Sequence, residues 1–316
     1  MELDFNLRIV ISGGAGYIGS VLVPALIEEH HQVTIIDNFM YGQSPLNALC
    51  SSAFFDVVNG DARDARLLKP LLAKADVFIP LAALVGAPLC DRDVLAATST
   101  NVGAIETAIA LMSKNQQILI PISNSGYGVG EPGKECTEES PLKPLSLYGQ
   151  TKVHAEKVVM DRGNAISFRL ATVFGMSPRM RIDLLVNDFV YRAVHDKAVV
   201  LFEADFKRNY IHIRDVVSAF MQGLYRFSKM KDQIYNVGLS EANLSKRELC
   251  VRIKEHVPGF VFLESPIGED IDKRDYIVSN AKIEATGWRP KHSLDAGIKE
   301  LITGYKMLRN TVHGNV

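Results

Sequence analysis

The sequence predicts an α/β fold built on a doubly wound parallel sheet. Along the first half of the chain, short apolar runs alternate with segments in which apolar residues recur every three or four positions. The runs are continuously apolar, which is typical of strands buried on both faces. Strands that alternate with helices in this way favour a parallel sheet with right-handed crossovers.

The pattern also predicts where each element lies. Strands are expected at Leu7–Ser12, Gln32–Asp37, Phe54–Gly60, Val77–Ala83, Gln117–Ser123 and Ala165–Val173. Helices are expected between them at Tyr17–His30, Ala65–Lys74, Val94–Lys114 and Leu147–Gly163. After about residue 176 the pattern loosens into a helix-like Ile182–His195 and a strand-like Lys197–Phe202. We therefore expect a main domain over residues 1–176 and a smaller α/β lobe over 177–316, with segments of about 209–238 returning to the main domain.

Composition argues against several classes of protein. The 316 residues are 47% hydrophobic and 22% charged, and the formal net charge is −1 with scattered Lys and Arg, so a nucleic-acid-binding face is not expected. The apolar runs are shorter than the ~20 residues of a membrane helix, and no apolar signal region opens the chain. The cysteines lack paired spacing and His neighbours, so we expect a reduced, cytoplasmic protein without metal or disulfides. They are Cys50, Cys90, Cys136 and Cys250.

The strongest local signal is LRIVISGGAGYIG at residues 7–19. Gly13, Gly16 and Gly19 follow a strand and precede a helix, and the next strand ends in Asp37. The first glycine permits a tight turn, the second lets the backbone approach a pyrophosphate, and the third allows close helix packing. The stretch thus predicts a Rossmann dinucleotide site. Because the Asp37 carboxylate would repel a 2′-phosphate and no Lys or Arg lies within residues 38–45, NAD is favoured over NADP.

A second signal is the pair Tyr148 and Lys152, which are four residues apart in an expected helix. This spacing places both side chains on one helix face. A lysine ammonium near a phenol lowers the pKa of the phenol, and a cationic nicotinamide would lower it further. Tyr148 is therefore a candidate base that takes a proton from an alcohol.

Together these motifs resemble the short-chain dehydrogenase/reductase superfamily, in its extended branch of nucleotide-sugar epimerases and dehydratases. The likeness extends over nearly the whole chain and rests on several stretches in the right order. They are GGAGYIG, Asp37, GDARD at 60–64, LAA at 81–83, STNVGAIET around Asn101, SNSGYG at 123–128, the Tyr148–Lys152 pair, RNYIHIRDV at 208–216 and GWRP at 287–290.

The resemblance implies a role for each matching cofactor residue. The pyrophosphate loop would be Gly13, Ala15, Gly16, Tyr17 and Ile18, the ribose site Asp37 and Asn38, the adenine site Asp61 and Ala62, and the cofactor groove Leu81, Ala82 and Ala83. Tyr148 and Lys152 would be the catalytic base and the lysine that also holds the nicotinamide ribose. Asn101 matches a buried asparagine near the active-site helix. Two alternatives stay open, because Asp61 also suits a strand-end turn and Asn101 a purely structural role.

Alignment of SNSGYG with the family places Ser123 at the catalytic hydroxyl, where it would stabilise charge on the reacting oxygen. Ser125 is the competing serine and a candidate substrate contact. The family's 4,6-dehydratases carry an acidic pair directly after this hydroxyl, whereas this chain has Asn124 and Ser125. We therefore expect an NAD-dependent nucleotide-sugar epimerase that inverts C4 through a transient ketone. The alternatives are a dehydrogenase or reductase, a dehydratase with a relocated acid, and a catalytically silent NAD-binding protein.

Arginines are the expected contacts to the substrate diphosphate. Arg208 matches the family arginine with this role, and Arg274 is a further candidate. Arg179 and Arg181 either bind phosphate or lie exposed on the surface, and Asn187 is expected near them at the substrate. Cys90 is expected to be a small buried residue. The resemblance also implies a homodimer through the helices near 94–114 and 147–162.

Overall fold

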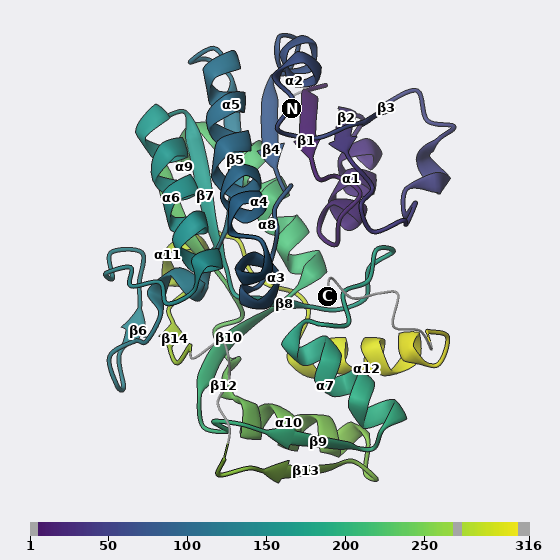
Figure 1. Cartoon of the computed structure of the whole chain (residues 1–316), viewed down its shortest axis with the longest axis vertical. Coiled ribbons are helices and arrows are strands. Elements are labelled where there is room, and N and C mark those ends of the chain that lie inside the picture. Colours follow the sequence, from purple (N-terminus) through teal and green to yellow (C-terminus); the bar gives the residue numbers. More distant parts are fainter. Residues whose placement is uncertain (1–5, 268–273, 309–316) are drawn as a thin grey trace.

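The computed structural model describes residues 6–267 and 274–308 of the chain. Its centre is a seven-stranded parallel sheet in the order β11–β7–β5–β4–β1–β2–β3 (Figure 1). The strands are β1 (Arg8–Ser12), β2 (Gln32–Asp37), β3 (Phe55–Asn59), β4 (Val77–Pro80), β5 (Gln117–Ser123), β7 (Ala165–Leu170) and β11 (Gln233–Val237). The predicted doubly wound parallel sheet is confirmed.

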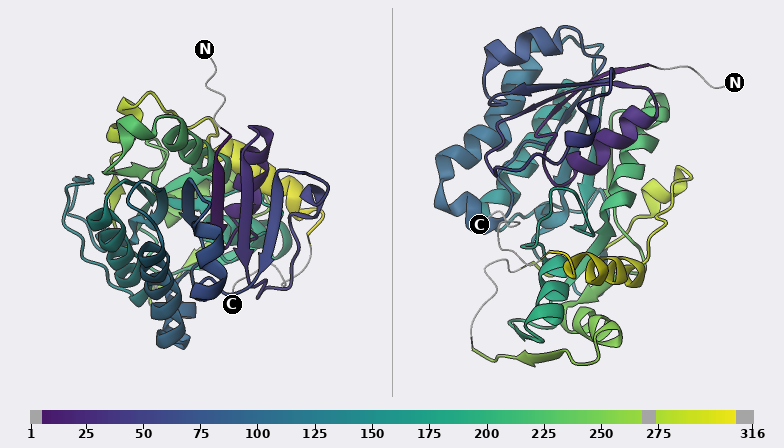
Figure 2. Two further views of the ribbon diagram at one scale, coloured as in Figure 1. Left: turned by 90° about the horizontal axis from the view of Figure 1, so that it is seen from above. Right: turned by 90° about the vertical axis from the view of Figure 1, so that its right-hand side faces the viewer.

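Helices cover both faces of the sheet (Figure 2). On one face, α1 (Gly19–Glu28) and α8 (Ile213–Tyr225) share a core with side chains such as Ile9 and Ile11 of β1. The other face is covered by α2 (Ala65–Leu72), α4 (Val94–Thr98), α5 (Ala104–Leu111) and α6 (Leu147–Arg162). Successive residues of β1 thus enter opposite cores, which explains why this strand is continuously apolar.

Three predicted elements differ from the structure. The run Ala165–Val173 is two strands, because the chain leaves the main sheet after Leu170 and continues as β8 (Thr172–Phe174) beside β10 (Lys207–His212). The strand predicted at Val77–Ala83 ends at Pro80, where the next two backbone amides both bond to the carbonyl of Ser12. The helix predicted at Val94–Lys114 contains a π-helical turn, η2 (Ser99–Gly103), and ends at Leu111.

The smaller lobe lies below the sheet in Figure 1 and has its own core. This core packs α7 (Leu185–His195), α10 (Lys246–His256) and α12 (Leu294–Tyr305) together. Its strands are β8, β10 and β12 (Asn243–Ser245) in one sheet and β9 (Ala198–Leu201) with β13 (Val261–Glu264) in another. The remaining short elements are η1 (Asn47–Leu49), α3 (Ala87–Arg92), η3 (Asn124–Tyr127), β6 (Glu135–Cys136), α9 (Phe227–Met230), β14 (Ile277–Val278) and α11 (Ala281–Ala285). Although β11 pairs with β7 in the main sheet, the domain boundary near residue 176 stays a prediction.

One helical stretch, Val94–Leu111, is long and apolar enough by composition to cross a membrane, with a mean hydropathy of 1.3. The sequence did not predict such a stretch, because its continuous apolar runs have only the length of strands. The stretch packs on α2 and α6 as one of the helices that cover the sheet, and core helices of soluble proteins have the same composition. It therefore carries no argument for a membrane.

Candidate active site

Two adjoining cavities open at the carboxyl edge of the sheet. There β1 lies between β2 on one side and β4 on the other, and the strand order changes direction. Such a switch in strand order is the usual ligand site of doubly wound sheets. The Asp37 cavity, of about 460 Å³, holds Asp37, Asn38, Asp61 and Ala62 on its wall. The Tyr148 cavity, of about 420 Å³, is lined by Ser123, Tyr148 and Lys152 among others. Both volumes are typical of small-molecule sites.

The glycine loop lines both cavities. Gly13 has a φ of +72°, and a Cβ there would lie 2.5 Å from the amide nitrogen of Ala82. A Cβ on Gly19 would lie 2.3 Å from the carbonyl oxygen of Gly14, so this glycine permits close packing of α1. Gly16 lines both cavities, and only the oxygen of Gly13, at 3.1 Å, would touch its Cβ. The loop therefore exposes backbone to both cavities at the N-terminus of α1, which fits a cofactor pyrophosphate.

Asp37 lies at the end of β2 with its carboxylate already oriented. One oxygen accepts a hydrogen bond from the amide of Ala15 and the other from the amide of Phe39, both at 2.9 Å. A carboxylate has about four acceptor positions, so two remain for ribose hydroxyls. The remaining predicted groove residues, Leu81, Ala82 and Ala83, line the same cavity. The residues present therefore fit the adenosine half of NAD.

Asp61 lines the Asp37 cavity but is already paired. Its carboxylate receives hydrogen bonds from the Arg63 guanidinium, the shortest at 2.6 Å, and these bonds lower the pKa of Asp61. A second nitrogen of Arg63 donates to Ser99 Oγ at 2.9 Å. Because Asp61 offsets the charge of Arg63, this arginine does not make the cavity a site for a 2′-phosphate. The expected adenine contact stays a prediction.

Local structure brings Ser123, Tyr148 and Lys152 to one cavity. Ser123 ends β5 and caps η3, because its Oγ accepts a hydrogen bond from the amide of Ser125 at 3.1 Å. Helix α6 begins after Ser146, whose Oγ accepts from the amide of Gly149 at 3.2 Å. Tyr148 lies in the first turn of α6 and Lys152 one turn later. In this arrangement Tyr148 can act as a base on a substrate hydroxyl, Lys152 can stabilise the charge on Tyr148, and Ser123 can donate a hydrogen bond to the substrate oxygen.

Burial and charge act in opposite directions on Tyr148. Burial raises the pKa of the phenol, while the positive charges of Arg181 and Arg274 and a hydrogen bond with Ser123 lower it and offset part of the rise. Lys152 is buried, and this desolvation lowers its pKa to about 8. The site therefore holds an ammonium group whose charge is costly to bury.

Replacement of Lys152 by methionine should stabilise the cofactor-free protein. The folded pKa of about 8 is below the value of about 10.4 for an unfolded lysine, so unfolding takes up a proton between these pH values. The free energy of unfolding of the natural protein should thus rise with pH across this window, by about 3 kcal/mol in total. Lys152→Met should gain about 1–3 kcal/mol at pH 7 and lose this dependence. Urea unfolding of both proteins at pH 7 to 10 measures the free energy of unfolding. If this free energy rises with pH as steeply in Lys152→Met as in the natural protein, the buried Lys152 charge is not its cause.

Three predicted site residues do not line either cavity. Asn101 bonds through its amide to both backbone groups of Leu84, at 2.8 and 3.0 Å, and to Thr151 Oγ1 at 3.1 Å. It therefore joins η2 to α6, as the structural alternative for Asn101 expects, and its cofactor contact stays a prediction. Asn187 bonds to the amide of Gly175 and to the carbonyl of Arg181, and its substrate contact stays a prediction too. Ser125 is a buried residue of η3 and does not line the cavity, unlike its competitor Ser123.

The arginines expected near the substrate all lie on the Tyr148 cavity. Arg208 is buried, and Arg274 lies beside the same space. Arg179 and Arg181 are 2% and 8% exposed, so the alternative of a surface position is wrong for both. Arg181 pairs with Asp183 at 2.5 Å. Cys90 is fully buried as predicted, and burial raises the pKa of its thiol to about 11.

Sequence reasoning missed several residues that line the cavities. Tyr41 lines both, and Asp183 and Asp188 line the Tyr148 cavity. Tyr41 follows the strand that ends in Asp37 by only four residues, which was a usable signal, whereas nothing local marks the two aspartates. In residues 6–267 and 274–308, no group of three or more His, Cys, Asp or Glu side chains is arranged to hold a metal ion.

The chain resembles one family of known proteins both in sequence and in structure. The model of the NAD dependent epimerase/dehydratase family matches residues 9–238. The chain is 28% identical to a putative UDP-glucose 4-epimerase of Methanocaldococcus jannaschii, over 94% of this chain and 98% of that one. It is 27% identical to UDP-glucuronic acid decarboxylase 1 of Arabidopsis thaliana, over 95% and 70% of the two chains. The structure of dTDP-glucose 4,6-dehydratase from Bacillus anthracis with NAD superimposes with a TM-score of 0.81 at 21% identity, over 95% and 97% of the chains.

Proposed function

The chain belongs to the NAD dependent epimerase/dehydratase family, and we propose that it is a nucleotide-sugar epimerase that inverts C4. NAD is the cofactor of this family, in agreement with the cofactor expected from Asp37 and the glycine loop. Its relatives include epimerases, dehydratases and decarboxylases, so family membership leaves the reaction open. The choice among them rests on the side chains around the reacting oxygen.

The proposal depends on the side chains around the reactive serine, because among the described residues no unpaired carboxylate lines the Tyr148 cavity. Elimination of water needs an acid for the leaving hydroxyl and a base for the neighbouring carbon. After Ser123 the chain has Asn124 and Ser125, and the Asn124 side chain is fully buried. Within the described ranges, the carboxylates on the Tyr148 cavity are Asp183, paired with Arg181, and Asp188, paired with Arg192 at 2.8 Å. Both carboxylates are held in ion pairs and neither directly follows Ser123, although burial raises the pKa of Asp188 against the effect of Arg192. Inversion without elimination therefore suits this cavity better.

The side chains of the Tyr148 cavity supply the steps of an inversion. Bound NAD supplies a reversible hydride acceptor. Tyr148 takes the proton from the C4 hydroxyl, and Ser123 donates a hydrogen bond to the same oxygen as it becomes a carbonyl. Protonated Lys152 stabilises the tyrosinate. When the ketone has turned in the cavity, Tyr148 returns the proton to the oxygen of the opposite stereoisomer.

NMR of candidate substrates tests this proposal. The full chain should be incubated with UDP- and dTDP-linked hexoses and hexuronic acids. We expect a mixture of the two C4 stereoisomers of one sugar nucleotide, with no net formation of NADH. A 4-keto-6-deoxy sugar would mean elimination, a pentose product would mean decarboxylation, and one NADH per ketone would mean a dehydrogenase. Each of these results would replace the proposed reaction.

We also propose a homodimer in the cytoplasm. Val94 and Leu95, on helix α4, are 53% and 83% exposed, and α4 and α6 pack against each other. Large apolar side chains exposed on the surface of a helix favour burial against a second copy. Analytical ultracentrifugation of the chain at micromolar concentration measures the assembly state directly.

A further inference from the structure

Arg179 is a buried cation in an unusual position. It lines both the Asp37 cavity and the Tyr148 cavity, whereas Arg208 and Arg274 line the Tyr148 cavity alone. The side chain is 2% exposed. Gly13 and Gly16 also line both cavities, so Arg179 and the glycine loop belong to the walls of the same passage.

Tyr41 holds the guanidinium from the other side of the groove. Its ring centroid lies 4.1 Å from Cζ of Arg179, which is a cation–π contact, and Tyr41 also lines both cavities. The Tyr41 hydroxyl oxygen is buried and has no hydrogen-bond partner among the residues that the structure describes. A buried hydroxyl without a partner is uncommon in folded proteins and indicates a missing acceptor.

The loop that carries Arg179 is fastened to the first turns of α1. The amide of Arg179 donates to Ser20 Oγ at 3.3 Å, and this oxygen lies 2.8 Å from Ser177 Oγ. The Tyr17 hydroxyl donates to the carbonyl of Gly175 at 2.7 Å. Arg179 is thereby held near the helix N-terminus where a dinucleotide pyrophosphate binds.

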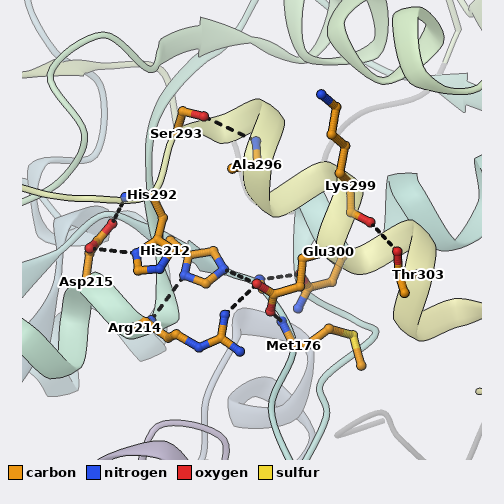
Figure 3. A network of polar contacts seen from close by, with 12 residues as sticks. Met176, His212, Arg214, Asp215, His292, Ser293, Ala296, Lys299, Glu300 and Thr303 are labelled. Carbon is orange, nitrogen blue, oxygen red and sulfur yellow. Dashed lines mark hydrogen bonds and ion pairs between the residues drawn. The ribbon is translucent and has the colours of Figure 1, made fainter.

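A second set of contacts fixes the start of the same loop (Figure 3). Glu300 of α12 accepts hydrogen bonds from the amide of Met176 at 2.9 Å and from Arg214 at 2.6 Å, and it pairs with His212 at 3.2 Å. Burial acts to raise the pKa of Glu300, but these partners outweigh it and lower the pKa to about 2. Glu300 therefore stays ionised at physiological pH and keeps the loop in place.

We propose that Arg179 and Tyr41 form a strap over the NAD pyrophosphate, in which the guanidinium and the phenol hydroxyl bind phosphate oxygens opposite the glycine loop. The strap joins the loop after β2 to the loop after β8, so cofactor release requires the two loops to separate. A cofactor held in this way stays bound between turnovers, as an enzyme without net redox change requires. The inference rests on NAD as the cofactor of the family and not on the carbon that the enzyme inverts.

Electrostatics supports this position for the cation. Burial lowers the pKa of Arg179, and the neighbouring charge of Arg181 lowers it further. Asp183 and Asp37 raise the pKa of Arg179 and so favour its charged form, and one guanidinium nitrogen donates to the carbonyl of Met180 at 2.9 Å. A diphosphate brings two negative charges, and Arg binds phosphate oxygens through several donors at once.

Release of radiolabelled NAD from the full-length protein tests the strap. Arg179→Gln should accelerate release about 10- to 100-fold, as expected for a lost hydrogen-bonded charge. Arg179→Lys, which keeps the charge, should have a smaller effect, and Tyr41→Phe should accelerate release about 3- to 10-fold. Equilibrium dialysis should show that Arg179→Gln weakens binding of NAD and of ADP-ribose by the same factor. Binding of adenosine, which lacks phosphate, should not change.

Arg208→Gln is the matched control, because Arg208 is a buried arginine of the Tyr148 cavity alone. It should weaken binding of UDP or dTDP and leave ADP-ribose unchanged. If Arg179→Gln instead weakens UDP or dTDP and spares ADP-ribose, Arg179 belongs to the substrate site and the strap is wrong. Circular dichroism melting of each variant separates binding effects from misfolding, and Tyr41→Phe supplies a second test should Arg179→Gln fail to fold. None of these measurements depends on turnover, so they stand apart from the test of epimerisation.

Discussion

Replacement of Tyr148 by phenylalanine should reduce the turnover number by about 10²- to 10⁴-fold, the range in which a positioned acid or base contributes to catalysis. The phenol lies on the same cavity as Ser123, and although burial raises its pKa, the charges of Arg181 and Arg274 offset part of that rise. Phenylalanine keeps the ring and its packing but removes the hydroxyl. Binding of NAD and of the nucleotide sugar should therefore stay nearly unchanged.

Initial rates of C4 inversion, followed by NMR, measure this effect, and equilibrium dialysis measures cofactor binding in the same samples. Tyr225→Phe is the matched control, because Tyr225 ends α8 and is 55% exposed. It should retain the natural rate. A Tyr148→Phe protein with more than a tenth of the natural rate would mean that another group takes the proton.

Removal of the carboxylate of Glu156 should cost about 3–5 kcal/mol of the free energy of unfolding. Glu156 of α6 and Arg169 of β7 form an ion pair at 2.6 Å, and each side chain is 5% exposed. Arg169 also donates to the Tyr127 hydroxyl at 3.1 Å, which ties η3 to the main sheet. Glu156→Gln leaves the Arg169 charge buried without its counter-ion. Removal of one partner of a buried ion pair destabilises the fold more than replacement of both partners by apolar residues.

Chemical denaturation with saturating NAD measures the loss. The double replacement Glu156→Leu with Arg169→Met should be less destabilising than Glu156→Gln, because apolar side chains of similar size replace both charges. Asp161→Asn is the control on the same helix, because Asp161 pairs with Lys157 at the surface. It should cost less than about 1 kcal/mol. A loss below 1 kcal/mol for Glu156→Gln would mean that water or another carboxylate reaches Arg169.

The fold was predictable because its signals are local. The central strands β1 and β4 are continuous apolar runs, and the glycine loop lies between β1 and α1 as the spacing of Gly13, Gly16 and Gly19 indicates. The break after Leu170 was not predictable in the same way. Residues on both sides of it are apolar, and only the pairing of β8 with β10, almost 40 residues later in the chain, separates the two strands.

The site was predictable where a motif holds its residues together. Ser123, Tyr148 and Lys152 belong to short patterns, and the structure brings them to one cavity. Arg179 and Asn187 differ, since their environments come from Tyr41, Tyr17 and Gly175 on distant segments. The sequence around Arg179 is polar and rich in arginine, which is typical of an exposed segment. In the folded protein, contacts with residues far along the chain bury it. Asn101 shows the same limit, because helical periodicity does not reveal the π-helical turn that directs its side chain to Leu84.

The two backbone hydrogen bonds to Asp37 have a consequence for the thermodynamics of cofactor binding. Ordering a mobile side chain at a binding site costs about 0.5–1.5 kcal/mol of conformational entropy. Because the amides of Ala15 and Phe39 already hold this carboxylate, ribose binding avoids that cost. Ala15 also belongs to the glycine loop, so the sugar and phosphate contacts of the dinucleotide form one rigid template. Discrimination between nucleotides at this end then arises from fit to a preset shape and not from rearrangement.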